Sequence, residues 1–582
     1  MRVGTKRLTG LVALSAVGLL GVAACGTSKS NGGSQSTASA GYSACATSPD
    51  TCNSGPRKAG GDIVVALGKY PSVWNEWSSN GNTVETIEQT NLISPTVYTF
   101  LPGGKIQWNQ DLLASEPQVT STSPQTVVYK LKPTAKWSNG TPISADDFIY
   151  DWKTNNGHDK NIPIVGSTGY DSIQSVTGSD NGETVTVVFS KTYADWKGLF
   201  TVPMYPAWYA KQKVGGLDTD AQLEAAFKVW DAPPTEWSGG PYKLSNVQSQ
   251  QSATFVPNTA WYGADKPSLK TITFKYITDQ TQDVPALQNQ EVQALNIQPD
   301  QDTVQQLSQI PGVNYEVSAG FSWEHLDFNY TNKFLKDAAL REAIFDAVNV
   351  QDMIDKTIKP FFPTAKPLYN HNIMPGVQGY EDIVKKTTPD AGTGDVDKAK
   401  SVLQAAGYTG IGTKLVPPSG GNQVTLNFVH TDTQVRDQSA QLVVQYLAQL
   451  GIKVNNKVTA DLGGSLTNFD FDIIQFGWSS SPLLSGNHDL WFTGAGNNFT
   501  HWGDPQSDQL LDQMTQQLDP VKQAALLNQQ DTIMSKAFVD LPLYQKPNLQ
   551  VATNQYINIR DNNAGSYFTY NTQQWGLTAS AQ

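Results

Sequence analysis

The chain has little charge, few cysteines and none of the short motifs that identify common enzyme classes. Only 16% of its 582 residues are charged, the net charge is −12, and Lys and Arg form no block. This disfavours nucleic acid and anionic lipid surfaces as partners, because both require clustered positive charge. The motifs G-x-S-x-G, H-E-x-x-H and G-x-x-x-x-G-K-[ST] are also missing.

Metal and cofactor signals are equally sparse. Gly410-Ile-Gly412 begins a dinucleotide-binding pattern, but Leu415 stands where the third glycine is needed. We therefore expect no catalysis, no cofactor and no metal ion. The six histidines are scattered singly, at positions 158, 325, 371, 430, 488 and 501.

The first residues form a secretory signal. Arg2, Lys6 and Arg7 precede an apolar run over residues 8–24, which ends in small residues followed by Cys25. The arrangement resembles a bacterial lipobox, so we expect removal of residues 1–24 and acylation of Cys25; the alternative is an ordinary signal peptide with an incidental cysteine. No later stretch reaches the about 18 apolar residues that span a membrane. The prediction is a lipid-anchored protein on the extracytoplasmic face of a bacterial cell membrane.

The segment after Cys25 is predicted to be a tether. Residues 26–44 are rich in Gly, Ser, Thr and Asn, and the flexible region should extend to residue 60. Cys45 and Cys52 lie within it, and two cysteines so close together in an oxidising compartment predict a disulfide. A metal or redox site is the weaker alternative, because neither histidine nor a C-x-x-C pattern supports it.

The remaining chain reads as mixed α/β. Alternating apolar residues predict strands at 126–131, 184–189 and 271–276, after an apolar strand at 62–67. Helical periods occur at 338–348, 397–406, 437–450 and 507–519. Acids and glycines at helix ends read as caps rather than as chemistry: Ser144 with Asp147, Asp337, Gly407 and Gly451.

Aromatic residues are the abundant feature, with 15 Trp, 22 Tyr and 21 Phe. Tyr70, Trp74 and Trp77 lie in a polar segment marked by Pro and Gly, and Trp478 follows an apolar strand at 471–476. Aromatic side chains on such loops are typical walls of a ligand cleft. The alternative is that they fill seams between domains.

One ordered set of motifs resembles the extracellular solute-binding proteins of oligopeptide and dipeptide ABC importers, known as family 5. The most specific match is Leu131–Phe148 (LKPTAKWSNGTPISADDF). The resemblance extends over about residues 60–580. Further matches follow in the family's order: Ser238–Leu244, Asn258, Trp261–Gly263, Leu326–Asn329, Asp337, Arg341–Ile344, Ala347, Ala405–Tyr408, Leu450–Ile452, Phe471–Asp472, Gly477–Trp478 and Leu541–Tyr544.

The resemblance implies a two-lobed α/β fold like that of periplasmic binding proteins, with an extra third domain and a ligand cleft between the lobes. Lobe I would comprise residues 61–105, 236–325 and 546–582, the inserted domain 106–235, and lobe II 326–545. Such proteins close by hinge motion and deliver their ligand to a membrane permease and its ATPase. We expect a monomer whose partners are a peptide or other small solute, these transporter subunits, and membrane lipid through Cys25.

The resemblance also implies how a peptide would bind. Relatives hold it as an added strand, here between Ala66–Tyr70 and Gly477–Ser481. Ser481 stands where peptide-binding relatives carry an Asp for the ligand's ammonium group, so either Asp489 or Asp472 takes over or the ligand lacks a free amino terminus. An oligosaccharide ligand, and a sensor or partner role without transport, remain alternatives. The predicted ligand-binding residues are Ala66, Gly68, Tyr70, Trp74, Trp77, Gly477, Trp478, Ser479, Ser481 and Asp489.

Overall fold

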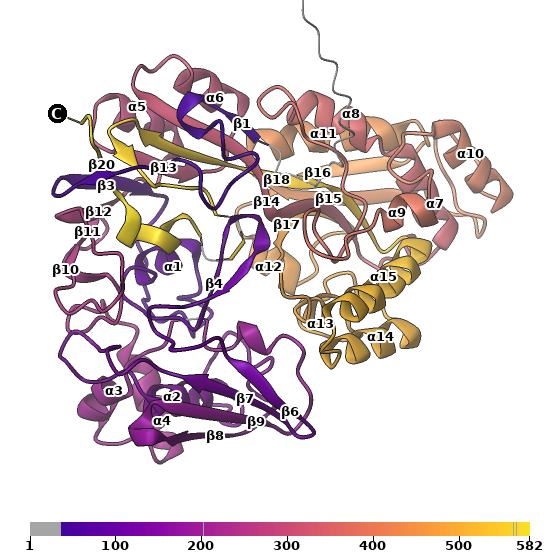
Figure 1. Ribbon diagram of the computed structural model, residues 1–582. Coiled ribbons are helices and arrows are strands. Elements are labelled where there is room, and N and C mark those ends of the chain that lie inside the picture. The colour runs from indigo at the N-terminus through magenta and orange to yellow at the C-terminus, as the bar shows by residue number, and fades with distance from the viewer. Residues whose placement is uncertain (1–35, 202, 563, 566, 582) are drawn as a thin grey trace, which may run out of the picture.

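One mixed sheet of eleven strands runs through both halves of the molecule (Figure 1). The computed structural model describes residues 36–201, 203–562, 564–565 and 567–581. The strand order is β10 (Tyr242–Gln248), β11 (Ser252–Pro257), β12 (Thr271–Tyr276), β3 (Asp62–Leu67), β13 (Ala294–Ile297), β18 (Asp540–Thr553), β14 (Val313–Phe328), β17 (Ile473–Ser479), β15 (Thr425–Thr431) and β16 (Lys453–Thr459), with β1 (Ser36–Ala38) paired to β14.

The long antiparallel strands β14 and β18 connect the two halves. Near Val313 they pair in the half that contains β13, and near Phe328 β14 lies between β18 and β17 in the other half. Their register shifts between Ala319 and Trp323, midway along the pair. Because a bulge of this kind bends a strand, the two halves meet at an angle there.

Helices cover the sheet in both halves. In the first half they are α1 (Val84–Thr90), α5 (Asp283–Gln288) and α6 (Gln301–Leu307). In the second half they are α7 (Ala338–Ala347), α8 (Val350–Thr357), α9 (Ile383–Thr387), α10 (Val396–Ala405), α11 (Gln434–Ala448), α12 (Leu462–Thr467), α13 (Asn487–Trp491), α14 (Pro505–Thr515) and α15 (Pro520–Ala537).

A separate four-stranded sheet lies within residues 106–235, below the first half in Figure 1. Ser144 caps α2 (Ala145–Asn155) as predicted: the Asp147 carboxylate accepts a hydrogen bond from the backbone NH of Ser144, which completes a capping box. The sheet order is β6 (Gln118–Thr122), β7 (Gln125–Lys130), β9 (Thr184–Phe189) and β8 (Ile173–Ser179), covered by α2, α3 (Ala207–Val214) and α4 (Asp220–Val229).

The segment before β3 differs from the flexible tether predicted for residues 25–60. From residue 36 onward it packs on the folded body: β1 pairs with β14, and Arg560 donates a hydrogen bond to the Cys52 carbonyl oxygen. Cys45 and Cys52 form the predicted disulfide. Cys25 and the signal lie outside the described residues.

The short strands are β2 (Arg57–Lys58), β19 (Tyr556–Ile557) and β20 (Gly576–Thr578) in one sheet, and β4 (Tyr98–Phe100) with β5 (Ile106–Trp108) in another.

Most of the predicted elements are present. The strands at 62–67, 184–189 and 271–276 have the predicted bounds, and the predicted helices begin and end within four residues of α7, α10, α11 and α14. Asp337 caps α7, and Gly407 and Gly451 adopt positive φ after α10 and α11. No helix among the described residues has the length and apolar character needed to cross a membrane.

Candidate ligand-binding cleft

Two adjoining cavities lie where the two halves of the large sheet meet. The larger, of about 400 Å³, is bounded by the end of β3, by α5 and by β13 on one side, and by Ser322 and Ser479 on the other. The smaller, of about 200 Å³, continues between Asp300 of α6 and the segment 432–436 at the start of α11. We call the two together the cleft. Both cavities are lined by Gln280, Gln298, Lys546 and Pro547.

Strand alternation decides which side chains face the cleft. Glu324 of β14 is paired with Gly477 of β17 and with Tyr544 of β18, so these three residues form one row on one face. Trp323, paired with Trp478, belongs to the next row and points to the opposite face. Tyr544, Lys546 and Asn548 of β18 accordingly line the cleft.

A buried ion pair forms part of the cleft wall. Nη2 of Arg436 lies 2.6 Å from Oε1 of Glu324, and Nε donates to Oε2 at 3.1 Å. Burial alone would raise the pKa of Glu324, but the charge and hydrogen bonds of Arg436 outweigh it and hold this pKa below its ordinary value. Gly477 lies against this pair, since a Cβ there would be 3.1 Å from Oε1 of Glu324.

Lys546 is a second cation beside this pair. Its side chain is partly buried, and the described residues provide no hydrogen bond or ion pair to its ammonium group. Burial lowers the pKa of Lys546, and repulsion from Arg436 lowers it further. The attraction of Glu324 acts in the opposite direction but is outweighed. Among the described residues, therefore, no carboxylate forms an ion pair with this ammonium group of the cleft.

The opposite wall carries a carboxylate. Asp283, at the start of α5, lines the larger cavity and is only 3% exposed. Burial, with a smaller contribution from Asp279, raises the pKa of Asp283 to about 6. No hydrogen bond to this carboxylate is formed by the described residues. Glu85, at the start of α1, lines the same cavity and lies 4.0 Å from Lys69. The cleft thus offers two acids on the β3 side and a cation on β18.

Three of the predicted ligand-binding residues line the cleft: Ala66, Gly68 and Ser479. Trp74 and Trp77 do not line it, because both side chains are buried in the core and at most 2% exposed. Trp77 packs there on Tyr205, with ring centroids 4.6 Å apart. Tyr70 packs against Tyr276 at 5.3 Å, at the margin of this core. Their burial agrees with the alternative interpretation, in which the two tryptophans fill a seam between domains.

The remaining predicted residues lie elsewhere. Trp478 stacks on Phe499, with ring centroids 5.7 Å apart, on the face opposite Gly477. Oγ of Ser481 accepts a hydrogen bond from its own turn, from the backbone NH of Leu483. Neither Trp478 nor Ser481 is among the described residues that line the two cavities.

Neither acid expected to replace the missing anchor reaches the cleft. Asp489 accepts a hydrogen bond from Thr168 and lies 3.7 Å from His488, at the contact with the inserted sheet. Asp472 precedes β17 and is bonded to Asn332 and to the backbone NH of Asn427, at the end of β17 away from Ser479. Both carboxylates are already occupied by structural contacts.

The charged groups of the cleft were missed in the sequence. Glu324, Arg436 and Lys546 come from three distant segments, and only the structure brings them together. A weak signal existed for Lys546, because it is the one cation in the otherwise apolar and amide-rich strand 540–553. A lysine in a strand of that composition indicates either an edge position or a site.

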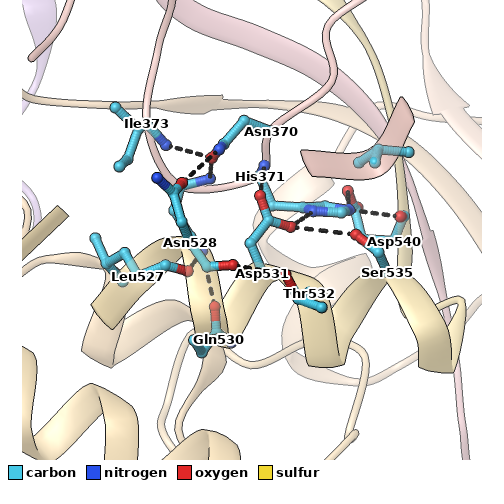
Figure 2. A network of polar contacts seen from close by, with 12 residues as sticks. Asn370, His371, Ile373, Leu527, Asn528, Gln530, Asp531, Thr532, Ser535 and Asp540 are labelled. Atoms are coloured by element: carbon cyan, nitrogen blue, oxygen red, sulfur yellow. Dashed lines mark hydrogen bonds and ion pairs between the residues drawn. The ribbon is translucent and has the colours of Figure 1, made fainter. Parts of the chain in front are cut away.

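A separate buried network joins residues of β14, β18 and α15. Figure 2 shows the part around His371, Asp531 and Asp540. His371 contacts Asp531 through Nδ1 and the backbone carbonyl of Asp540 through Nε2 at 2.8 Å. His325 lies 2.6 Å from Oδ2 of Asp540 and 3.3 Å from Oδ1 of Asp327. All five side chains are at most 2% exposed.

Part of this network could in principle hold a metal ion, since His325, Asp327 and Asp540 place one ligand atom each within 4.8 Å of one another. The 2.6 Å contact between His325 and Asp540, however, is the length of a direct charge-assisted hydrogen bond. Two ligands of one ion, each about 2.1 Å from it, stay roughly 3 Å apart. We therefore interpret the cluster as ion pairs that share protons.

The network makes the stability depend on pH. Burial opposes the charge of His371, but Asp531 and Asp540 more than compensate and raise its pKa to about 9. The stabilisation is therefore complete below the ordinary His pKa of about 6.5 and is lost as the pH rises through about 9. We expect the unfolding temperature to fall over this range, and the fall to be smaller in His371→Gln. An equal fall in both proteins would contradict this assignment.

The comparisons with known proteins agree with this architecture. Residues 110–500 match the model of the bacterial extracellular solute-binding proteins, family 5. The oligopeptide-binding protein OppA of Mycobacterium tuberculosis is 28% identical over 500 residues, which cover 84% of this chain and 80% of that protein.

Two solved structures extend the comparison. The periplasmic EDTA-binding protein EppA superposes with a TM-score of 0.86 at 31% identity and covers 91% of this chain and 99% of its own. The oligopeptide-binding protein AppA of Bacillus subtilis, in complex with a nonapeptide, superposes with a TM-score of 0.73 at 18% identity over 90% of this chain and 100% of its own, which supports the fold. The chain belongs to the bacterial extracellular solute-binding proteins of family 5.

Proposed function

We propose that the protein is the lipid-anchored receptor of an ABC importer, which captures an extracellular peptide in the cleft and delivers it to a membrane permease. In this proposal residues 61–105, 236–325 and 546–582 form one lobe and 326–545 the other. Ligand contacts to both lobes would favour closure about β14 and β18. The family membership supports the transport role, and the naming of OppA as an oligopeptide-binding protein supports the ligand class.

The observation that carries the peptide assignment is the edge of β17. Strand β15 pairs with β17 only at Ile473–Gln475, and within the described residues no strand pairs with that edge beyond Gln475. The edge ends at Ser479, which lines the larger cavity opposite Ala66 and Gly68. An extended peptide could add there as a strand, with backbone hydrogen bonds for affinity.

The ammonium group of such a peptide needs a carboxylate partner. Ser481 stands where peptide-binding relatives carry an aspartate, so another residue must supply this carboxylate. Asp283 is available, since it is buried in the cavity wall without a hydrogen-bond donor from the described residues. A ligand ammonium group would restore its charge and lower its raised pKa. We assign this role to Asp283 in place of Asp489 or Asp472.

A second candidate ligand is an aminocarboxylate chelate. EppA, named for binding EDTA, shares 31% of its residues with this chain over almost its whole length. A chelate of that class presents several carboxylates and no peptide backbone, so it would need cations rather than a strand edge. The cleft offers Lys546 for this purpose.

Mass spectrometry of the small molecules released on denaturation tests the proposal. The protein beginning after Cys25 is purified without added ligand, unfolded, and its extract compared with that of an unrelated secreted protein. Peptides of a defined length are expected. A chelate would retain the transport role and replace the peptide. No released molecule, together with no thermal shift in peptide and chelate mixtures, would contradict solute capture.

A further inference from the structure

We propose that the cleft anchors a carboxylate group of its ligand on Lys546. The ligand is then an acid and not an uncharged solute. The inference rests on the proposed solute-binding function and names the charge chemistry that the site requires. The source of the carboxylate is either the carboxyl terminus of a peptide or an aminocarboxylate chelate.

The position of Lys546 is the first argument. It lines both cavities, at the point where they meet, and the amides of Gln280 and Gln298 line the same two cavities from the other side. It lies on β18 opposite the shift in register of β14, where the two halves of the sheet join. A ligand group bound there contacts both halves and would favour their closure.

The distribution of charge is the second argument. Glu324 is already held by Arg436 through two hydrogen bonds and accepts a third from Gln475. Within the described residues no carboxylate lies within 4.0 Å of the Lys546 ammonium. The cluster therefore contains two cations and one anion, which leaves one positive charge without an opposite charge.

The other acids along the cleft do not answer that charge. Asp300 accepts hydrogen bonds from the backbone NH and the hydroxyl of Thr303, as the cap of α6. Asp432 is exposed to solvent. Asp283 and Glu85 line the larger cavity together with Lys546, but among the described residues neither carboxylate lies within 4.0 Å of its ammonium group, and Glu85 lies 4.0 Å from Lys69. Withdrawing an ammonium from water is unfavourable unless an anion pairs with it. A ligand carboxylate supplies that anion, and the lowered pKa of Lys546 agrees with its burial beside Arg436.

Paired ligands that differ only in this charge test the inference. The full-length chain in detergent is dialysed against three probes: a random pentapeptide mixture with free carboxyl termini, the same mixture as carboxyl-terminal amides, and Fe(III)-EDTA. Bound probe is measured by mass spectrometry for the wild type, Lys546→Gln and Lys546→Arg. Lys522→Gln is the matched control, because Lys522 is exposed on α15 and forms no ion pair with the described residues.

The wild type is expected to retain either the free-acid peptides at least tenfold more than the amides, or Fe(III)-EDTA. Lys546→Gln should abolish that preference or weaken chelate binding at least tenfold, while Lys546→Arg and Lys522→Gln keep it. If Lys546→Gln unfolds at the same temperature as the wild type, misfolding is excluded as the cause.

Each contrary result is informative. Equal retention of acids and amides, or unchanged binding by Lys546→Gln, overturns the carboxylate site while leaving solute capture intact. Retention of none of the three probes overturns the carboxylate site together with the proposed function.

Discussion

Replacing Arg436 with methionine should lower the free energy of unfolding by about 3–5 kcal/mol, because it leaves the buried Glu324 carboxylate without its partner. Glu324 is 4% exposed and Arg436 11% exposed as side chains, so solvent cannot replace the lost cation. Urea denaturation followed by tryptophan fluorescence measures the change. The effect should be the largest of any single substitution at the cleft wall.

Two further variants separate this reason from a general packing effect. The double variant Glu324→Leu with Arg436→Met should recover most of the lost stability, since no charge is left buried. Lys386→Met breaks an ion pair with Glu381 whose side chains are 60% and 50% exposed, and should change stability by less than about 1 kcal/mol. A double variant as unstable as Arg436→Met alone would contradict the account of this pair.

Replacing Asp531 with asparagine should lower the free energy of unfolding by about 3 kcal/mol or more. The substitution keeps the shape of the side chain but removes the anion that Nδ1 of His371 contacts in Figure 2. In the wild type both partners of the ring accept, the Asp531 carboxylate at Nδ1 and the Asp540 carbonyl at Nε2, so the ring is held as the imidazolium whose charge Asp531 balances. The pKa of His371 should fall toward its ordinary value.

The matched control is Asp512→Asn on the neighbouring helix α14. Asp512 also contacts a histidine, His488, but its side chain is 59% exposed. We expect a change of less than about 1 kcal/mol there. NMR titration of His371 gives the second measurement. An unchanged His371 pKa in Asp531→Asn would show that Asp531 is not its counter-ion.

The parts of the fold with a local physical cause were predictable from the sequence. The alternating strands 184–189 and 271–276 and the capping box at Ser144 follow from side-chain period and backbone chemistry. The family motifs then implied the two-lobed architecture, which the superposition on EppA supports. These features depend on residues that are close together in the chain.

The errors arose where distant segments decide the outcome. The polar segment around Trp74 and Trp77 reads as a loop, yet Asn75 and Glu76 are themselves buried, because the Phe227 carbonyl and Thr90 bond to them. Residues 36–60 read as a tether because their ordering comes from β14 and Arg560, several hundred residues away.

The candidate site shows the same limit. Ala66, Gly68 and Ser479 were placed by motif and lie in the cleft, whereas Glu324, Arg436 and Lys546 are unremarkable charged residues until β14, α11 and β18 come together. Asp283 likewise has the sequence context of a helix start, and only its burial in the cavity wall distinguishes it.

Filling the cleft is the measurement that tests the central claim most directly. Ser479→Trp places an indole in the larger cavity, beside Ser322, and Ser401→Trp adds the same group on the exposed surface of α10. The ligand recovered from denatured wild-type protein is titrated into both variants by calorimetry. We expect Ser401→Trp to bind as the wild type does and Ser479→Trp to show no measurable binding. Unchanged affinity in a folded Ser479→Trp variant would contradict the assignment of this cleft as the ligand site.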